Sequence, residues 1–589
     1  MILNMKKSYL FLAAMAALSQ FMYGQTSPNG KVKVEQNGQN LEVSYKKGEA
    51  WQKVLTLDAG AASKSQMSLG KAAYEMLVGK KSECINEYYE CTYTRTADGK
   101  PVTVRVYNDG VAWTGLPAYN VNIAAAKNSW LQRWTEAYEE FFPKNREQKE
   151  GARWAYPALF EYDNDVFALL TESCITADNA ASSLYSVDGK NYSIRAEVAS
   201  NHGVYENRIG GWQTLIVGGL SDVVESTLVT DNSESRKLSD VSWIKPGVAS
   251  WVYWAYNHGS NDYDIIKKYT DMAVELKLPY VLIDAEWDGM KNGKTIEDAV
   301  KYAVDNGVKP IIWYNSSVGW VDGAPTPKFL LNKAEDREKA FAWCEKIGVS
   351  GVKIDFFSGD NNLNMNYMIE LMECAAKHHL LVNFHGATLP RGWQRTYPNL
   401  VSTEGVYGAE WYNNVPTFTK KAAAHNATLP FTRNVVGSMD YTPCAFTDSQ
   451  HPHITTHAHE LALTALFESG IQHLADRPES FLAQPQEVKD YLSNLPTAWD
   501  ETRLLSGYPG ESAVMARRKG DVWYIAGING RDEAQTLSFD VSPLSRMGKT
   551  VVVFEDSGKP AKPWKISKRK AVPSSITCLA RGGFVMVVK

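Results

Sequence analysis

This chain of 589 residues has no excess of basic side chains. Lysine and arginine together number 62, against 66 aspartates and glutamates, and the net charge is −4 with histidine neutral. Affinity for nucleic acid comes mainly from basic side chains that neutralise phosphates. The composition therefore argues against nucleic acid as a partner.

Cysteine is scarce, and its seven positions lie far apart in the chain. The odd number and wide spacing match neither a disulfide framework nor a zinc-binding pattern. We expect most of these cysteines to be buried as small apolar side chains. Cys84 and Cys91 would be able to pair within an N-terminal hairpin, and the sequence leaves that pairing open.

Long apolar runs are missing beyond the first residues, so we expect no membrane-spanning helix. The start of the chain has two lysines within residues 5–7, a short apolar stretch at 9–18 and a small residue, Gly24. This order is typical of a secretory signal peptide, so we predict a signal segment at 1–24 and a periplasmic protein. No cysteine follows the apolar stretch, so a lipid anchor is not expected.

Repeats, low-complexity segments and flexible linkers are also missing, which indicates domains that pack together. The length predicts about three domains, which we place at 25–245, 246–498 and 499–589. Hydrophobic residues make up 44% of the chain and charged residues 22%, as in a globular protein. The aromatic share of 11% fits sugar binding and large β-sandwiches equally well.

The first domain is predicted to be a large antiparallel β-sandwich. Segments such as 41–45 and 102–107 are short, alternate between apolar and polar residues and are bounded by Gly, Asn or Asp. Asp-Gly pairs at 98–99 and 109–110 are hairpin signals. Helical periodicity is scarce throughout this part.

At Lys245 the pattern changes to apolar runs that alternate with amphipathic stretches. Eight strands alternating with helices over about 250 residues predict a (β/α)8 TIM barrel. The expected strands are 249–256, 280–284, 309–314, 351–355, 380–385, 400–403, a weak one within 431–441, and 471–475. The expected helices are 264–276, 295–306, 333–347 and 366–379.

Short strands return after residue 499 and predict a small antiparallel β-sandwich at the end of the chain. They are expected at 512–517, 522–528, 536–540, 551–554 and 583–588. Asn-Gly at 529–530 and Ser-Gly at 557–558 are turn signals between them.

Polar residues follow several of the predicted barrel strands. The run 349–357 stops on Asp355, and the neighbouring strands lead into Asp284, His385, and Glu404 with Glu410. Asp355 alone would read equally well as a helix N-cap. Four such strand ends indicate a working site, because the carboxyl ends of barrel strands converge. Paired carboxylates from different strands are what glycoside cleavage requires.

Several motifs resemble glycoside hydrolase family 97, in order along the chain. They are SWVYW (250–254), GSNDYD (259–264), PYVLID (279–284), GVKIDF (351–356), NFHG (383–386), RTYPNL (395–400), EGVYGAE (404–410), PFTRNVVGSMDYTP (430–443) and WDET (499–502). The resemblance implies an N-terminal β-super-sandwich, a catalytic (β/α)8 barrel and a C-terminal β-sandwich.

The resemblance also implies a mechanism. Inverting members, which are α-glucosidases, carry a glutamate just after the strand-five histidine, where this chain has Gly386. Retaining members place an aspartate nucleophile at the end of strand four, which corresponds to Asp355, and Glu410 matches the general acid/base. The expected activity is a retaining exo-α-galactosidase acting on an oligosaccharide or glycoside. A β-L-arabinopyranosidase, an α-glucosidase and a non-catalytic sugar-binding protein are the alternatives, and the oligomeric state is left open.

Calcium is the cofactor that the resemblance implies. Glu404 and Glu410 match two of the family's calcium ligands, and Glu172 of the N-terminal domain matches a third. A purely structural role for Glu172 would be a surface position on an edge strand. Gly386 removes a carboxylate that the inverting branch supplies, so the full ligand set stays open.

The remaining site candidates are expected to line the sugar-binding subsite. His385 would hydrogen-bond a hydroxyl, and Lys353 lies on the same strand face as Asp355. Asp284 and Trp313 stand at other strand ends. A further group of histidines, at 451, 453, 457 and 459, shows no metal-ligand spacing, and we expect a surface or cap role for them.

Overall fold

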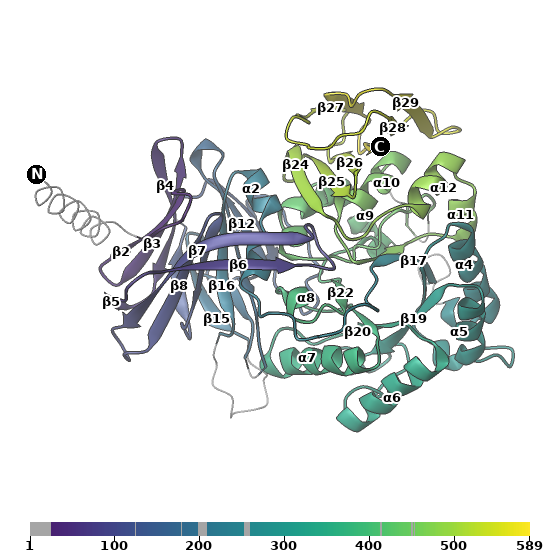
Figure 1. The fold of residues 1–589 in the computed structure, drawn as a ribbon, viewed down its shortest axis with the longest axis horizontal. Helices are drawn as coiled ribbons and strands as arrows, with labels where there is room; N and C mark the ends of the chain where they lie inside the picture. The colour runs from purple at the N-terminus through teal and green to yellow at the C-terminus, as the bar shows by residue number, and fades with distance from the viewer. Residues whose placement is uncertain are drawn as a thin grey trace, which may run out of the picture.

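The computed structural model describes residues 25–589 except 124, 178, 198–208, 253–258, 413–414, 449–450 and 453. The expected signal peptide and His453 therefore lie outside the described residues. Three regions follow one another along the chain (Figure 1). None of the helices described is long and apolar enough to cross a membrane.

The N-terminal region is almost entirely β-sheet, as predicted, and all its described strand pairs are antiparallel. The sequence alternates between apolar and polar residues, which favours strands with one buried face. In β8, for example, every second side chain is buried along most of the strand. Its strands are β1 (Gln25–Thr26), β2 (Val32–Asn37), β3 (Asn40–Lys47), β4 (Ala50–Asp58), β5 (Ala61–Lys64), β6 (Ser68–Glu75), β7 (Glu83–Arg95), β8 (Pro101–Tyr107), β9 (Gly110–Thr114), β10 (Tyr119–Asn122), β11 (Asn128–Arg133), β12 (Arg153–Glu161), β13 (Phe167–Ser173), β14 (Ser182–Ser186), β15 (Asn191–Ala196) and β16 (Trp212–Gly218). The short helices η1 (Asp163–Asp165), α2 (Leu220–Glu225) and α3 (Leu228–Asp231) complete the region.

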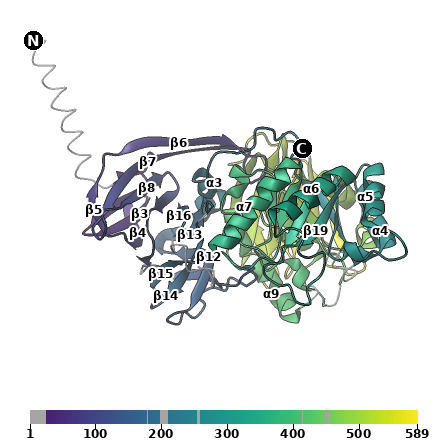
Figure 2. The same cartoon turned by 90° about the horizontal axis from the view of Figure 1, so that it is seen from below.

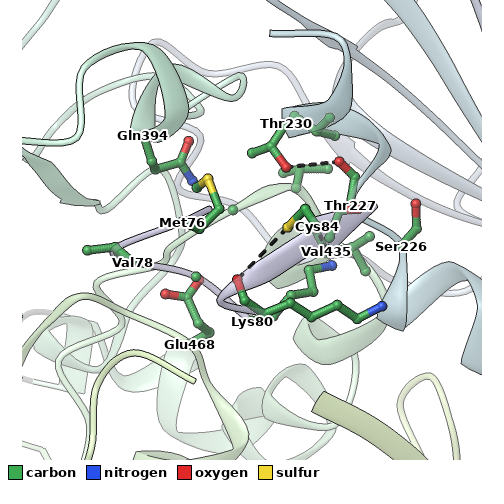
Figure 3. A pocket seen from close by; sticks show the side chains of 15 residues that line it. Met76, Val78, Lys80, Cys84, Ser226, Thr227, Thr230, Gln394, Val435 and Glu468 are labelled. Carbon is green, nitrogen blue, oxygen red and sulfur yellow. Dashed lines mark hydrogen bonds between the residues drawn. The ribbon is translucent and has the colours of Figure 1, made fainter. Parts of the chain in front are cut away.

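The hairpin of β6 and β7 extends from this sheet to the other two regions (Figures 1 and 2). At its turn, Lys80 Nζ donates hydrogen bonds to the carbonyls of Val224 and Val435, at 2.8 and 2.9 Å. Thr502 Oγ1 of the C-terminal region donates to the carbonyl of Lys80 at 2.8 Å. Figure 3 shows Lys80 beside Val435 and Glu468 in a small cavity of about 30 Å³. The turn therefore connects all three regions.

The central region contains seven parallel strands, in the order β22-β21-β20-β19-β18-β17-β23. They are β17 (Gly247–Val252), β18 (Tyr280–Ile283), β19 (Lys309–Asn315), β20 (Gly351–Asp355), β21 (Leu381–Phe384), β22 (Leu400–Thr403) and β23 (Ile471–Leu474). Each matches a predicted strand, and the barrel architecture is confirmed.

The seventh predicted strand, expected within 431–441, is not a strand in the structure. The chain there forms η6 (Leu429–Phe431) and η7 (Arg433–Val436). The buried guanidinium of Arg433 donates hydrogen bonds to five backbone carbonyls around this gap, among them those of Thr403 and Glu404. The side chain of Arg433 thus satisfies backbone carbonyls that a strand between β22 and β23 would otherwise bind.

Helices cover the outside of the barrel sheet, and the four predicted helices are confirmed within a few residues (Figure 1). Side-chain caps begin several of them, such as Asp262 at α4 and Asn361 at α7. Within the described residues, the helices of this region are η3 (Gly259–Asn261), α4 (Tyr263–Glu275), η4 (Trp287–Gly289), α5 (Ile296–Asp305), α6 (Ala334–Ile347), α7 (Asn362–Lys377), α8 (Trp393–Thr396), η5 (Ala409–Tyr412), α9 (Pro416–Asn426), α10 (His457–Leu466), α11 (Pro478–Leu482) and α12 (Gln486–Ser493).

The C-terminal region is antiparallel, as predicted, and forms one sheet of six strands and one of two. Its strands are β24 (Glu501–Tyr508), β25 (Ser512–Lys519), β26 (Val522–Asn529), β27 (Gln535–Ser538), β28 (Val551–Asp556), β29 (Trp564–Arg569), β30 (Ser575–Cys578) and β31 (Gly583–Val588). Helix α10 packs against this sheet, which buries His459 completely and contradicts its expected surface position.

All seven cysteines are free thiols, and six of them are buried. Cys84 and Cys91 do not pair, and both belong to the single strand β7.

Candidate active site

A cavity of about 690 Å³ opens at the carboxyl ends of the barrel strands. Its wall is formed by strands β18 to β20, the ends of β21 and β22, η5, the β19–α6 loop and the β11–β12 loop of the N-terminal region. The expected site residues Asp284, Trp313, Lys353, Asp355, Glu404 and Glu410 all line this cavity. Six of the predicted site residues therefore share one cavity, whereas His385 and Glu172 are not among the described residues that line it.

Asp355 is the last residue of β20 and is held on both carboxylate oxygens. Trp313 Nε1 donates to Oδ2 at 3.0 Å, and the backbone N–H of Phe356 donates to Oδ1 at 2.8 Å. Burial raises the pKa of Asp355, while Lys353, whose Nζ lies 3.9 Å from Oδ2, lowers it. The carboxylate is thereby fixed in orientation while it faces the cavity.

Lys353 joins Asp355 to a second carboxylate. Its Nζ donates to Asp284 Oδ2 at 2.9 Å, and Trp251 Nε1 donates to the same oxygen at 2.8 Å. Burial by itself would raise the pKa of Asp284, but the charge of Lys353 outweighs it and the net pKa is lowered. Lys353 therefore has an ionised partner on one side and Asp355 on the other.

Glu404 and Glu410 differ in their protonation tendencies although they are close neighbours. Burial and the charge of Glu404 raise the pKa of Glu410 well above its usual range. Burial would also raise the pKa of Glu404, but His385, with Nδ1 at 3.4 Å from Oε1, lowers it. The backbone N–H of Gly386 donates to Glu404 at 2.7 Å. Two carboxyl groups with pKa values driven apart are the arrangement of an acid beside a permanent anion.

Gly386 has a left-handed backbone with φ of 49°. A Cβ atom added there would lie 2.8 Å from Asp355 Oδ1 and 2.7 Å from the amide nitrogen of Phe356. Only glycine fits between β21 and the carboxylate of Asp355.

His385 is held from behind by Asp440, a residue that the sequence analysis missed. Asp440 Oδ2 lies 2.7 Å from His385 Nε2 and 2.7 Å from His473 Nδ1, and Asn383 Nδ2 donates to it at 2.6 Å. Asp440 belongs to the segment that was expected to form a weak strand within 431–441, and it was not among the predicted site residues.

Glu172 is not one of the described residues that line the cavity. It is completely buried in β13, between β12 and β16, so the surface position considered for it is wrong. Arg391 Nε donates to Oε1 at 2.7 Å, Ser182 Oγ to Oε2 at 2.7 Å and Gln213 Nε2 to Oε2 at 3.0 Å. Both of its oxygens are therefore occupied by protein donors.

Glu139 is a second carboxylate that the sequence analysis missed. It comes from the β11–β12 loop, lines the cavity and accepts a hydrogen bond from Trp411 Nε1 at 2.8 Å. Burial and the charge of Glu404 raise its pKa well above the usual range. The loop is anchored on either side, because Tyr138 hydrogen-bonds Asp360 and Phe141 packs against Tyr407. Its only sequence signal was the run of acidic and aromatic residues at 134–141.

A metal ion would find three possible ligands in one place. The ligand atoms of His385, Glu404 and Glu410 lie within 4.8 Å of one another, and Glu172 is not part of this group among the described residues. Carboxylate oxygens suit calcium, so Glu404 and Glu410 fit the ion that the resemblance implies. Glu172 does not fit, since its oxygens are occupied.

Comparisons with known proteins agree with this architecture. Three family models match in order: "Glycosyl-hydrolase 97 N-terminal" at 26–234, "Glycoside hydrolase 97" at 243–406 and "Glycosyl-hydrolase 97 C-terminal, oligomerisation" at 498–589. A "Probable retaining alpha-galactosidase" of Streptomyces bingchenggensis is 35% identical over 488 residues, which is 77% of this chain and 72% of that protein. A "Retaining alpha-galactosidase" of Bacteroides thetaiotaomicron is 30% identical over 385 residues, 60% of this chain and 55% of that protein.

Two solved structures share the fold over almost the whole chain. A "beta-arabinopyranosidase" superposes with a TM-score of 0.85 at 27% identity, over 96% of this chain and 100% of its own. A family 97 enzyme of Pseudoalteromonas sp. strain K8, in complex with panose, has a TM-score of 0.79 at 21% identity over the same shares. The chain therefore belongs to glycoside hydrolase family 97 and is a glycoside hydrolase.

Proposed function

We propose that this enzyme is a retaining, exo-acting glycoside hydrolase that releases terminal α-galactose. The observation that carries the proposal is the pair Asp355 and Glu410 on one cavity, with Gly386 leaving room for Asp355 and none for a base at 386. The names of two relatives as retaining α-galactosidases support it. The cavity volume falls in the range that encloses one small molecule.

Each step of the proposed reaction uses a group of the chain. Glu410, whose pKa is raised by burial and by the charge of Glu404, donates a proton to the leaving oxygen while Asp355 attacks the anomeric carbon. The resulting glycosyl-enzyme is hydrolysed by water, whose proton returns to Glu410. The charge of Lys353 favours the ionised form of Asp355. Lys353 and Asp284, which both line the cavity, supply polar contacts to the sugar hydroxyls. His385 does not line the cavity among the described residues and orients Glu404 from behind.

We also propose calcium as cofactor, held by Glu404 and Glu410. Glu404 is the stronger ligand of the two because its pKa is lowered. A bound calcium ion would supply a fixed positive charge beside the sugar.

β-L-Arabinopyranoside is the second candidate substrate. Its ring has the stereochemistry of an α-galactoside and lacks only the C5 hydroxymethyl group. The similarity to a solved β-arabinopyranosidase at a TM-score of 0.85 favours this candidate. The two activities are compatible with one pocket.

Hydrolysis of p-nitrophenyl α-galactoside, β-L-arabinopyranoside and α-glucoside, followed by NMR, tests the proposal. We expect cleavage of the first two, and α-galactose as the first product from the galactoside. Release of β-galactose first, or a preference for the glucoside, would contradict the proposed function. Export to the periplasm is part of the proposal, and cell fractionation of the full-length protein tests it.

A further inference from the structure

Trp320 is a large apolar side chain left open to solvent at the cavity. It lies in the loop between β19 and α6, is 52% exposed and belongs to the cavity lining. A half-exposed indole in a cavity lining presents a flat apolar face to any ligand that enters the cavity.

The loop that carries Trp320 is fixed to the backbone beside Asp355. Ser316 donates from its amide to the carbonyl of Asp355 at 2.8 Å and from its hydroxyl to that of Phe356 at 2.7 Å. The amide of Gly319 donates to the carbonyl of Phe356 at 2.9 Å. A Cβ atom on Gly319 would lie 2.5 Å from that carbonyl oxygen, so the close approach requires glycine.

The indole itself is also held in place. Its Nε1 donates to the carbonyl of Asp322 at 2.8 Å, and Asn315 Nδ2 donates to the carbonyl of Trp320 at 3.3 Å. Phe356 packs against the ring at 5.0 Å between centroids, with an interplanar angle of 71°. Because these contacts already order the side chain, a ligand would lose little binding free energy to ordering it.

An aromatic row leads from the carboxylate to this ring. Trp313 hydrogen-bonds Asp355, and its ring lies 5.8 Å from Phe356, which in turn contacts Trp320. Trp320 is therefore two rings away from the group that attacks the sugar. A group bound there would be the one attached to the leaving oxygen and not the sugar being attacked.

We propose that Trp320 is the platform of an aglycone subsite, which binds a ring-shaped leaving group by its flat face. This inference rests on the proposed function and adds the class of natural substrate: glycosides whose aglycone is a ring, either a second sugar or an aromatic group. Both kinds of ring present a face that packs on an indole.

The test compares substrates with and without an aglycone ring. α-Galactosyl fluoride fills only the sugar subsite, p-nitrophenyl α-galactoside adds an aromatic ring and melibiose adds a sugar ring. In Trp320→Ala we expect kcat/KM to fall about tenfold on melibiose, on the nitrophenyl glycoside or on both, and to stay unchanged on the fluoride. The substrate whose kcat/KM falls more, melibiose or the nitrophenyl glycoside, identifies the aglycone as a sugar or an aromatic group. Trp320→Phe should restore part of the loss.

Phe329→Ala is the matched control, since Phe329 is 60% exposed in the same loop and is not among the described residues that line the cavity. It should leave all three substrates unchanged. An equal fall of Trp320→Ala on the fluoride, or no fall on either ring-bearing substrate, would overturn the subsite. If the wild type cleaves only arabinopyranosides, the proposed sugar is wrong, and the same ratio measured with the arabinopyranosyl fluoride and nitrophenyl glycoside still decides the role of Trp320.

Discussion

Arg391 and Glu172 form an ion pair of 2.7 Å between Nε and Oε1, and neither side chain is exposed. Glu172 belongs to the N-terminal sheet and Arg391 to the barrel region, after β21. Arg391 also pairs with Asp360 at 3.1 Å and donates to the hydroxyl of Tyr138 at 3.0 Å. A buried charge that loses its partner destabilises a protein strongly, so this cluster ties the two regions together.

The pair predicts different outcomes for two glutamates that match the family's calcium ligands. Glu172→Gln should lower the free energy of unfolding by about 3 kcal/mol, because it leaves Arg391 with less compensating charge. Its calcium content should be unchanged, since the oxygens of Glu172 are already bound by protein donors. Glu404→Gln should lose calcium. Elemental analysis and thermal unfolding of both variants check this.

Removal of calcium from the wild-type protein by a chelator tests whether calcium is the cofactor. If calcium binds the folded state, EDTA should lower wild-type activity and melting temperature together, because the ion stabilises the state that holds it. Wild-type protein that contains no calcium and keeps both properties after EDTA would refute the cofactor. Loss of calcium in Glu172→Gln would refute the assignment of Glu172 to a purely structural role.

A barrel expressed from about residue 245 onward should be unstable and inactive. It would lack Glu172 and Tyr138, which leaves Arg391 and Asp360 without two of their partners, and Glu139 would be missing from the cavity. Solubility, circular dichroism and turnover of a nitrophenyl glycoside measure the effect. Co-expression with residues 25–245 is the control and should restore activity. A stable, fully active barrel would contradict the prediction.

Product stereochemistry should separate the roles of Asp355 and Glu410. Asp355→Gly should be nearly inactive, and azide should enter the space left and yield β-galactosyl azide, because Glu410 still protonates the leaving group. Glu410→Ala should still form the glycosyl-enzyme from substrates with good leaving groups, and azide should then yield the α-product. NMR of the azides decides the matter. Near-wild-type turnover in Asp355→Gly would make Asp355 a binding or cap residue.

Lys353→Met should move the acidic limb of the pH profile of kcat/KM to higher pH. The charge of Lys353 lowers the pKa of Asp355, so its removal lets the carboxylate take up a proton at higher pH. Trp313→Phe is the control, because it removes a hydrogen bond to the same oxygen without removing a charge. We expect lower activity there but a smaller shift of the limb. Equal shifts in both variants would argue against an electrostatic role for Lys353.

Gly386→Ala should reduce activity at least about a hundredfold, because its Cβ would displace the carboxylate of Asp355. Gly293→Ala is a matched control, since Gly293 also has a positive φ, of 68°, but nothing lies within 4 Å of the Cβ position. Both variants should lose similar backbone stability, and only the first should lose activity. Wild-type turnover in Gly386→Ala would show that the loop yields.

The positions of the barrel strands and of their polar ends were predictable because they depend on local patterns. Apolar runs, and the carboxylates that follow them, brought Asp284, Asp355 and Glu404 to one cavity in the prediction as in the structure. The apolar run around Val435 also predicted a strand, and this prediction was wrong. The run is buried without joining the sheet, because the hydrogen bonds of Arg433 replace those of a strand.

Contacts between distant segments were not predictable in this way. Glu172 and Arg391 are 219 residues apart, and no pattern in either segment indicates the other. Glu139 reaches Trp411 over 272 residues from a loop without regular periodicity. Asp440 contacts His385 across 55 residues, and the weak strand expected within 431–441 did not indicate that contact.

The crowding of Asp355 by residue 386 also restricts how this enzyme can change over evolution. The inverting branch of the family is expected to need a glutamate at 386, and the first atom of any side chain there collides with Asp355 Oδ1. A lineage that exchanges one stereochemical outcome for the other must therefore give up the aspartate before it gains the glutamate. A form that has lost the aspartate and not yet gained the glutamate lacks both groups, so single substitutions exchange the two outcomes only through a form without nucleophile or base.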